Sequence, residues 1–424
     1  MTSATQRHRA AAAATVGNAL QFYDFFLYAT AAALVFKSQF FPSTNPIVGT
    51  LGAFAGYAVG FVSRPLGGVV FGHIGDRFGR KITLTWTLGL MGLATFAIGL
   101  LPGYARIGPA APALLVLLRL LQGFAAGGEW GGGILMATEN APPHRRGLFG
   151  AWSQAGVGIG FILASGAFSL AHRLDAAAFL AWGWRLPFLA SVVVVAVGFV
   201  IRWRVDESEE FLAAESRDPH SHPVRDVLRR HPWPLALAGG VLLAEMTGPL
   251  LTTTFALAYG SLRGVDSGLM LTAVTISMVA DTVMMLVFGA LSDRIGRVPV
   301  FGFGIVAMTL GMYPFFMAMS SGSPLVVIAA FAAINGIGHA AMVGTEPALL
   351  TELFPAALRS SALALAQSVA SVLVGFVPLA ATSLYYATGS ILAVVGLMGA
   401  VGAISLAALL AAGRVLGVTR SPAG

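Results

Sequence analysis

Twelve stretches of this chain are apolar over about 20 residues each, the length of helix that crosses the hydrocarbon core of a bilayer. Only 10% of the residues are charged, against about a quarter in soluble domains. The chain therefore has too few charged residues for the surface of a water-soluble protein of this size. We therefore expect an all-α membrane protein with twelve transmembrane helices. The expected spans are residues 16–36, 48–71, 82–101, 112–137, 148–170, 185–201, 235–259, 268–291, 299–319, 324–350, 360–382 and 389–412.

The basic charge of the chain does not indicate a nucleic-acid partner. The net charge is +7 and the isoelectric point about 10.1, but the arginines lie in short tracts between apolar spans and form no single basic stripe. The absence of cysteine excludes a disulfide scaffold, a thiolate metal site and a cysteine nucleophile. Since no metal-ligand cluster, nucleotide loop or Ser–His–Asp spacing occurs, we expect neither an enzyme nor a cofactor.

Sidedness follows from the positions of the lysines and arginines. With the N-terminus inside, 18 of the 25 lie in inward-facing segments, so both termini are expected in the cytoplasm. Arg7 and Arg9 precede an alanine run, as in a signal peptide. The apolar stretch that follows contains Asn18 and Asp24 and continues to about Phe36, which favours a retained first span. We expect a multi-pass protein of a bacterial inner membrane.

Two short motifs each occur twice, which indicates an internal repeat. GHIGDRFGRK (72–81) returns as GALSDRIGR (289–297), and ENAPPHRRG (139–147) returns as ELFPAALRS (352–360), with offsets of 217 and 213 residues. Two pairs at nearly one offset predict six-helix halves of the same orientation, related by an axis along the membrane normal. The predicted parts are a bundle over 12–201, a cytoplasmic loop over 202–234 and a bundle over 235–414.

Charged residues of these motifs are candidates for a gate, because a closing rim needs contacts that can be broken. They could equally be anchors that set the topology, since arginines are expected in inward-facing loops. The candidate gating residues are Asp76, Arg77, Arg80, Glu139, Arg146, Asp293, Arg294, Arg297, Glu352 and Arg359.

The first of these motifs, with its weaker copy, resembles the signature of the major facilitator superfamily. GNALQFYDFFLY (17–28), RPLGGVVFGHIGDRFGRK (64–81) and RLLQGFAAGGEWGG (119–132) resemble its metabolite:proton symporter family, and within it the shikimate-transporting branch. The resemblance implies the major facilitator fold and proton-coupled uptake of a small metabolite. The chain departs from the family pattern at Gln21 and Phe22, where Glu-Trp is common, and at the acids Asp281 and Glu346.

Ionisable residues inside the spans are the candidates for function, because such groups are costly in a bilayer and normally face inward. Asp24 lies about eight residues, roughly 12 Å, from the inner end of span 1. Arg64 lies at a similar depth in span 2, so the two are predicted to pair. Asp24 could carry the proton or form a fixed salt bridge, and Arg64 could instead snorkel toward the headgroups.

One face of span 4 combines four candidate side chains. At 100° per residue, Trp130 returns to the direction of Arg119, and Glu129 to that of Gln122. Arg119 is suited to bind a substrate carboxylate, and Trp130 could pack against an apolar ring. Glu129 is a second candidate proton carrier, or a partner of Arg119 within the first half.

In the second half, Glu245 and Asp281 lie in the middle of spans 7 and 8. Asn335 and His339 are four residues apart in span 10 and therefore share a face. His339 could relay protons or only bond neighbouring helices. Glu346 is expected near the inner end of the span, within the rim network.

The repeat offsets align residues of the two halves. They align Asp281 with Arg64, Glu245 with Tyr28, and Asn335 with Gln122. We accordingly assign candidate substrate contacts to Arg64, Arg119, Tyr28, Gln122, Trp130, Glu245, Asn335 and His339. The candidate proton-coupling residues are Asp24, Glu129 and Asp281.

The interpretation is a monomeric proton-coupled symporter that imports a small organic acid, such as a shikimate-like carboxylate. Its partners would be the substrate, protons and the lipid bilayer. Three alternatives remain open: a symporter for a zwitterion of the betaine or proline type, a proton/drug antiporter, and a membrane sensor without transport.

Overall fold

The computed structural model describes residues 15, 18–19, 22–43, 46–78, 80–127, 134, 138, 141–203, 223–355 and 358–420. Helices make up nearly all of this part of the chain, and no strand occurs in it. Nine helices among these residues are long and apolar enough to cross a membrane, and two shorter apolar helices cover Thr85–Leu100 and Ala110–Ala126. Together with the helical residues of span 1 they match the twelve expected spans.

In the first half, the helical residues 22–31 lead directly into the π-helical η1 (Ala32–Phe36), which completes span 1. The others are α2 (Lys37–Gln39), α3 (Pro46–Val62), α4 (Arg64–Phe78), α5 (Arg80–Leu100), α6 (Tyr104–Ile107), α7 (Ala110–Ala126), the short 3-10 turn η2 (Pro143–Arg145), α9 (Arg146–Ala171), α10 (Ala176–Ala178), the π-helical η3 (Phe179–Gly183), α11 (Arg185–Leu189) and α12 (Ser191–Trp203).

Helices of the second half follow a short connecting helix, α14 (Pro223–Arg230). They are α15 (Pro232–Pro249), the π-helical η4 (Leu250–Phe255), α16 (Ala256–Leu262), α17 (Ser267–Ile295), α18 (Arg297–Met319), α19 (Pro324–Ala333), the π-helical η5 (Ile334–His339), α20 (Ala340–Val343), α21 (Glu346–Glu352), α22 (Arg359–Gly375), α23 (Val377–Thr388) and α24 (Ile391–Arg420).

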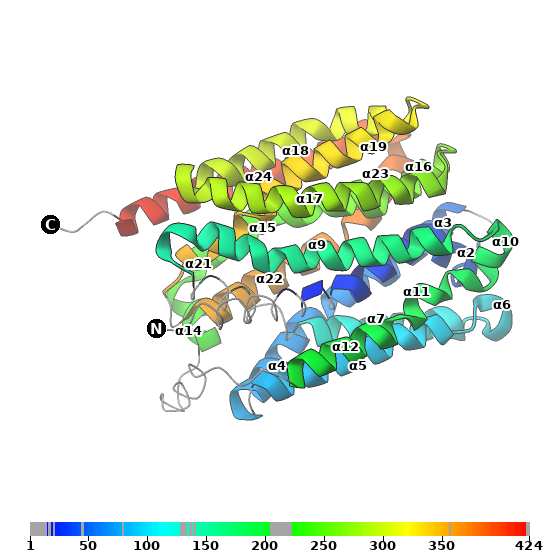
Figure 1. Ribbon diagram of the computed structural model, residues 1–424, viewed down its shortest axis with the longest axis horizontal. Helices are drawn as coiled ribbons and strands as arrows, with labels where there is room; N and C mark the ends of the chain where they lie inside the picture. The colour runs from blue at the N-terminus through cyan, green and yellow to red at the C-terminus, as the bar shows by residue number, and fades with distance from the viewer. Residues whose placement is uncertain are drawn as a thin grey trace.

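The two halves lie side by side with their helices along one common direction (Figure 1). In that view α17, α18 and α24 form the upper part and α4, α5 and α12 the lower part. The halves meet where α9 packs along α17 and where α22 and α23 pack on α3. The functional site should therefore lie between these helices, as in transporters with a midplane site.

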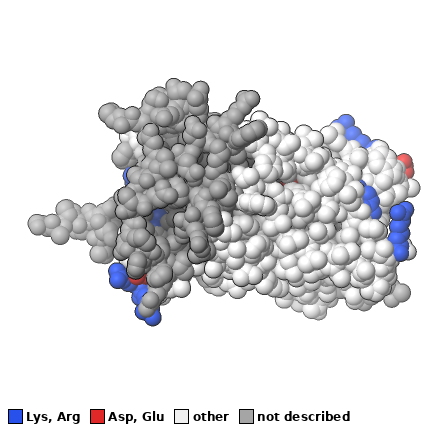
Figure 2. All heavy atoms as spheres, turned by 90° about the horizontal axis from the view of Figure 1, so that it is seen from below, with Lys and Arg blue, Asp and Glu red and all other residues white. Residues whose placement is uncertain are grey.

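Charge divides the described surface into two polar ends and an apolar belt. On the face shown in Figure 2, lysines and arginines lie mostly at the two ends, with a broad uncharged band between them. Large apolar side chains such as Leu310, Leu325 and Trp86 are more than two-thirds exposed on the helix surfaces. Water would not tolerate so many exposed apolar groups, whereas lipid chains solvate them.

Two breaks in the helices have local causes in the sequence. Span 2 is interrupted at Ser63, two residues before Pro65, whose ring lacks an N–H and disturbs a continuous helix. The hydroxyl of Ser63 donates to the carbonyls of Gly60 and Leu120 at the break, at 3.1 and 2.9 Å. The turn from α17 to α18 needs Gly296, whose φ of 99° and ψ of 160° are open essentially to glycine alone.

Candidate functional site

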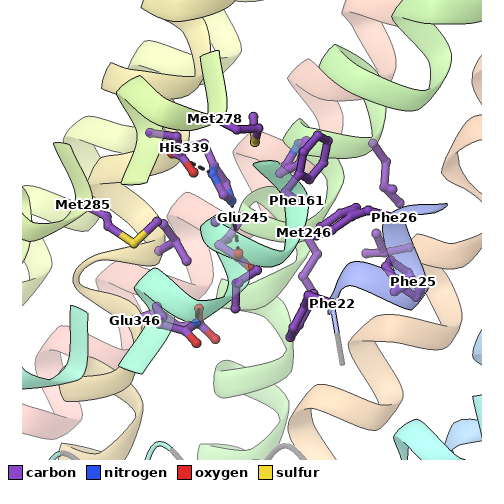
Figure 3. Close-up of a pocket in the computed structure, with 18 of the residues that line it drawn as sticks. Phe22, Phe25, Phe26, Phe161, Glu245, Met246, Met278, Met285, His339 and Glu346 are labelled. Carbon is purple, nitrogen blue, oxygen red and sulfur yellow. Dashed lines mark hydrogen bonds and ion pairs between the residues drawn. The ribbon is translucent and has the colours of Figure 1, made fainter. Parts of the chain in front are cut away.

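A cavity of about 90 Å³ lies between the halves and is lined by residues of both. Phenylalanines from span 1 and α9 form one wall, and the acidic residues with His339 form the other (Figure 3). One water needs about 10–15 Å³ of such space, so the cavity has room for several polar atoms. Its lining residues include Phe22, Phe25, Phe26, Phe61, Arg64, Gln154, Phe161, Glu245, Met278, Asp281, Met285, His339 and Glu346.

Three side chains of the second half form one hydrogen-bonded cluster. The Nδ1 atom of His339 lies 2.9 Å from Asp281 Oδ1, and its Nε2 atom lies 3.4 Å from Glu245 Oε1. The three groups come from η5, α17 and α15, and all three residues are buried. An imidazole with a carboxylate at each nitrogen can hold, accept or release protons without leaving its position.

A fourth titratable residue, Glu346, lines the same cavity. Its side chain is 1% exposed, and it begins α21 directly after a turn at Gly344 and Thr345. The Nε2 atom of Gln154 in α9 donates a hydrogen bond to Glu346 Oε2 at 3.2 Å. The expectation that Glu346 belongs to the rim network is therefore wrong, because this turn directs it into the cavity.

The arginines of the first half are held among aromatic rings. The guanidinium carbon of Arg64 lies 4.7 Å from the ring centre of Phe25 and 4.6 Å from that of Phe61. Arg119, behind it, lies 4.4 Å from the ring centre of Tyr28 and 4.9 Å from that of Tyr57. In the described part of the chain neither arginine forms an ion pair, so aromatic faces stabilise both cations there. Arg119 also donates hydrogen bonds to the carbonyl of Tyr57 and to Gln122, both at 3.3 Å.

The predicted pair between Asp24 and Arg64 does not form. Asp24 is buried, with 1% of its surface exposed, but Arg64 lies over the two phenyl rings and makes no ion pair with it. Equal depth does not ensure contact, because the direction of each side chain also depends on rotation about the helix axis.

The remaining polar candidates lie behind the cavity and brace it. Gln122 accepts from Arg119 Nη1 at 3.3 Å and donates to the hydroxyl of Thr95 at 2.7 Å. Asn335 accepts from the Thr252 hydroxyl at 2.9 Å and donates to the Ser277 hydroxyl at 3.3 Å. Tyr28 is fully buried beneath Arg119. Gln122 and Tyr28 contact Arg119, and Asn335 joins α19–η5 to its neighbouring helices; none of the three lines the cavity.

Asp293 lies in the second copy of the repeated loop motif, and it joins the two halves at this end of the bundle. Its carboxylate accepts from the backbone N–H groups of Gly147 and Leu148, at 2.9 and 3.0 Å. These are among the first N–H groups of α9, which lack partners within the helix and favour a negative charge. Arg297 binds Asp293 at 2.7 Å and Glu352 at 3.3 Å, which completes a network at this rim.

Other candidate gating residues take less part in this network. Arg294 is exposed, and Arg359 donates to the backbone carbonyl of Phe354 at 3.0 Å. The Nε atom of Arg146 is buried and has no hydrogen-bond partner among the described residues. The side chains of Asp76, Arg77 and Arg80 lie outside the described part, as do the residues Glu129, Trp130 and Glu139.

Gln154 is the site residue that sequence reasoning overlooked. It is the one amide in α9, a helix otherwise rich in glycine, alanine and apolar residues. A buried amide in such a span is a signal for an interhelical hydrogen bond. Phe61 and Phe161 were also overlooked, because phenylalanine in a span is by default a packing residue. No group of His, Asp and Glu in the described residues is arranged to hold a metal ion.

Comparison with known proteins gives consistent matches along the chain. Residues 10–236 match the family model of sugar (and other) transporters, and residues 240–423 match that of the major facilitator superfamily. The shikimate transporter of Escherichia coli is 39% identical over 392 residues, covering 90% of this chain and 89% of its own. The glycine betaine/proline/ectoine/pipecolic acid transporter of Dickeya dadantii is 36% identical, covering 87% and 76%.

Solved structures agree in fold. A proton:xylose symporter superposes with a TM-score of 0.75 at 16% identity, covering 98% of this chain and 97% of its own. The xylose transporter of Escherichia coli in a partially occluded, inward-open conformation superposes with a TM-score of 0.73 at 17% identity, covering 97% and 98%. At these identities the likeness bears on the arrangement of the helices and not on the substrate.

Proposed function

Because the chain belongs to the major facilitator superfamily of membrane transporters, we propose that it imports a small organic acid together with protons. The substrate carboxylate would bind Arg64, with Arg119 behind it. The proton would be exchanged on the acidic side of the cavity, and the two halves would rock about the bound substrate.

The observation that carries this proposal is the position of Arg64. It lines the cavity, and no acidic side chain of the described residues pairs with it. Arg64 is half-buried; a cation largely removed from water without a counter-ion is unfavourable, and contact with phenyl rings offsets only part of that cost. An organic anion entering the cavity would supply the missing charge through a forked, two-bond contact that guanidinium groups favour. The shikimate transporter among the relatives supports a carboxylate substrate.

A second candidate substrate is a zwitterion with a quaternary ammonium group. Phe22, Phe25 and Phe26 line the cavity together with Glu245 and Glu346, and aromatic faces beside acids favour a bulky cation. The Dickeya dadantii relative supports this alternative. A zwitterion would place its carboxylate at Arg64 and its ammonium group near the acids, so competition between carboxylates and betaines distinguishes the two candidates.

The test is uptake into proteoliposomes under an imposed pH gradient, screened across carboxylates and betaines. We expect accumulation of a carboxylate that collapses with the gradient. Arg64→Gln should lower uptake at low substrate concentration by roughly 10- to 100-fold, the loss expected for one or two charge-assisted hydrogen bonds, while Arg64→Lys should retain part of it. Arg106→Gln, at an exposed position, is the control. Full uptake by Arg64→Gln, or uptake of betaines alone, would refute the carboxylate assignment.

A further inference from the structure

The surface that α9 presents to the second half consists largely of backbone. A side chain at Gly150 would meet Pro347 at 2.8 Å, and one at Gly147 or Gly158 would overlap Gly289 or Thr282. These glycines, with Gln154, recur at helical spacing and so share one face. Gln154 is therefore a polar side chain on a face of α9 whose other contacts with the second half are made mainly by glycine backbone and apolar groups.

In the described part of the chain, two acidic residues make the polar contacts that join the halves through α9. Asp293 binds the first N–H groups of α9 at the rim, and Glu346 binds Gln154 about two turns deeper. Both Gln154 and Glu346 are almost fully buried, at 3% and 1% exposure. Glu346 therefore connects the cavity to the interface, as Figure 3 shows where it lies beside the ribbon of α9.

The geometry of the amide indicates a proton on Glu346. Gln154 Nε2 donates to the carboxyl group, but the Oε1 atom of the same amide is buried and has no hydrogen-bond partner. A buried acceptor without a donor is unfavourable. A protonated Glu346 would donate its O–H to that oxygen, which gives two reciprocal hydrogen bonds between acid and amide. A carboxylate can only accept from the amide Nε2, and it would leave the buried amide oxygen without a donor.

The charged groups around Glu346 also favour its protonated form. Glu245, Asp281 and His339 line the same cavity from α15, α17 and η5, and Gln367 of α22 faces it without charge. Arg64 is the cation that lines the cavity from the first half, while Arg297 of α18 is bound to Asp293 and Glu352. Three acids thus share one imidazole, and burying all of them as anions would be strongly unfavourable.

We infer that Glu346 exchanges the transported proton and that Gln154 reports its protonation to the other half. With the proton in place, the acid–amide pair holds α9 against α21 and the rim is closed. When the proton leaves, the pair loses one hydrogen bond and gains a buried charge, so α9 separates and this end opens. The inference rests on the proposed proton coupling but does not depend on which substrate is carried.

The first experiment follows the opening of the rim without substrate. The chain has no cysteine, so spin labels can be placed on cysteines at His144 and Ile295, two exposed residues at the rim on opposite halves. In lipid nanodiscs we expect one short distance in acid and an added longer one in alkali. Glu346→Gln, whose amide can pair with Gln154 at any pH, should keep the short distance throughout. Gln154→Leu should show the longer distance even in acid.

Ser153→Ala is the matched control, because Ser153 is a buried polar neighbour in α9 whose hydroxyl bonds within its own helix, to Gly150. It should respond to pH like the parent. If Glu346→Gln opens in alkali as the parent does, the inference is wrong. If that variant is not recovered in a folded state, Gln154→Leu decides: an unchanged response to pH would equally overturn the inference.

The second experiment separates exchange from accumulation in proteoliposomes. Glu346→Gln should exchange labelled for unlabelled substrate but should no longer accumulate it under a pH gradient. Accumulation by this variant at the parent level would overturn the inference. If the parent itself accumulates no carboxylate under the gradient, the proposed function fails, whereas the distance measurements still test the role of Glu346.

Discussion

His339 holds its two acidic neighbours in a way that neither could achieve alone. Its ring nitrogens lie 2.9 Å from Asp281 and 3.4 Å from Glu245, and the three groups come from different helices. Each acid is nearly or fully buried, so the imidazole compensates charge that water cannot reach. The cluster therefore ties α15, α17 and η5 together as well as offering sites for a proton.

We expect His339→Ala to destabilise the protein by about 3–5 kcal/mol, the cost of leaving buried charges without a partner. Thermal unfolding in detergent would measure the loss. Adding Glu245→Gln and Asp281→Asn to the variant should recover most of the stability, because no unpaired charge remains. His144→Ala, at an exposed position, should unfold like the parent. A stable His339→Ala variant would show that the acids are not charged in the folded state.

At the scale of the element, α9 determines how closely the halves approach. Its N-terminus is capped by Asp293 from the other half, and its glycines let α17 and α21 pack against its backbone. A helix whose N-terminal groups are satisfied by another domain loses that stabilisation when the domains separate. The two features together make α9 the main contact through which opening would occur.

Asp293→Ala should favour the open rim by about 1–2 kcal/mol, the usual value of an N-cap, which corresponds to roughly a tenfold change in population. The spin-label distance between positions 144 and 295 would report it. Asp266→Ala is the matched control, because Asp266 caps α17 within its own half by accepting from Leu269 N–H at 2.7 Å. That variant should lose stability without opening. Equal effects of both variants would contradict a gating role for Asp293.

Gly158→Val should also open the interface, because its side chain would overlap Thr282 of α17. Overpacking of this kind costs about 1–3 kcal/mol, and here it falls on the closed state alone. Gly166→Val, in the same helix with no atom near its added Cβ, should leave both the distance and the uptake unchanged. A closed Gly158→Val variant with normal uptake would show that the contact is not tight.

At the scale of the molecule, the two repeated halves place different charged groups in the cavity wall. The first half supplies the cation Arg64 to the cavity wall, and the second half supplies Glu245, Asp281, His339 and Glu346. Since the cavity lies between the halves, relative movement changes which groups face one another. The proposed sites of anion binding and of proton exchange therefore lie on opposite sides of the boundary between the halves.

Sidedness remains a prediction from the arginine-rich loops and can be measured directly. In cells, a cysteine at exposed Arg106 should react with a membrane-impermeant maleimide, because it is expected outside. A cysteine at Arg230, whose side chain is 75% exposed, should react only after the membrane is permeabilised. The chain has no other cysteine to interfere. The reverse pattern of labelling would invert the assigned orientation.

Hydropathy and the repeat were enough to predict the spans, because both are read from the order of residues along the chain and need no knowledge of contacts in space. The span expected over 48–71 is found as Val48–Phe71, and that over 299–319 as Arg297–Met319. They also led to Arg64, Glu245, Asp281 and His339, all of which line the cavity. Charged groups in a bilayer turn inward whatever the details of packing, so their presence in the site could be foreseen.

The partners of these residues could not be foreseen, because contacts depend on breaks that change the rotation of a helix. Arg64, directly after the break at Ser63, lies over Phe25 and Phe61 and does not pair with Asp24. Glu346, directly after the turn at Gly344 and Thr345, lines the cavity. The π-helical turns η4 and η5 likewise alter the register of spans 7 and 10. A count of residues at constant rise and rotation misses each of these changes.

The bare surface of α9 has a consequence for conformational entropy. Glycine and alanine have no side-chain rotamers to immobilise, so bringing this face against α17 orders little beyond Gln154. Closing the halves there loses little entropy, and parting them regains little. The balance between the two states would then depend on a few polar groups, so in the proposed mechanism one proton or one bound anion would suffice to shift it.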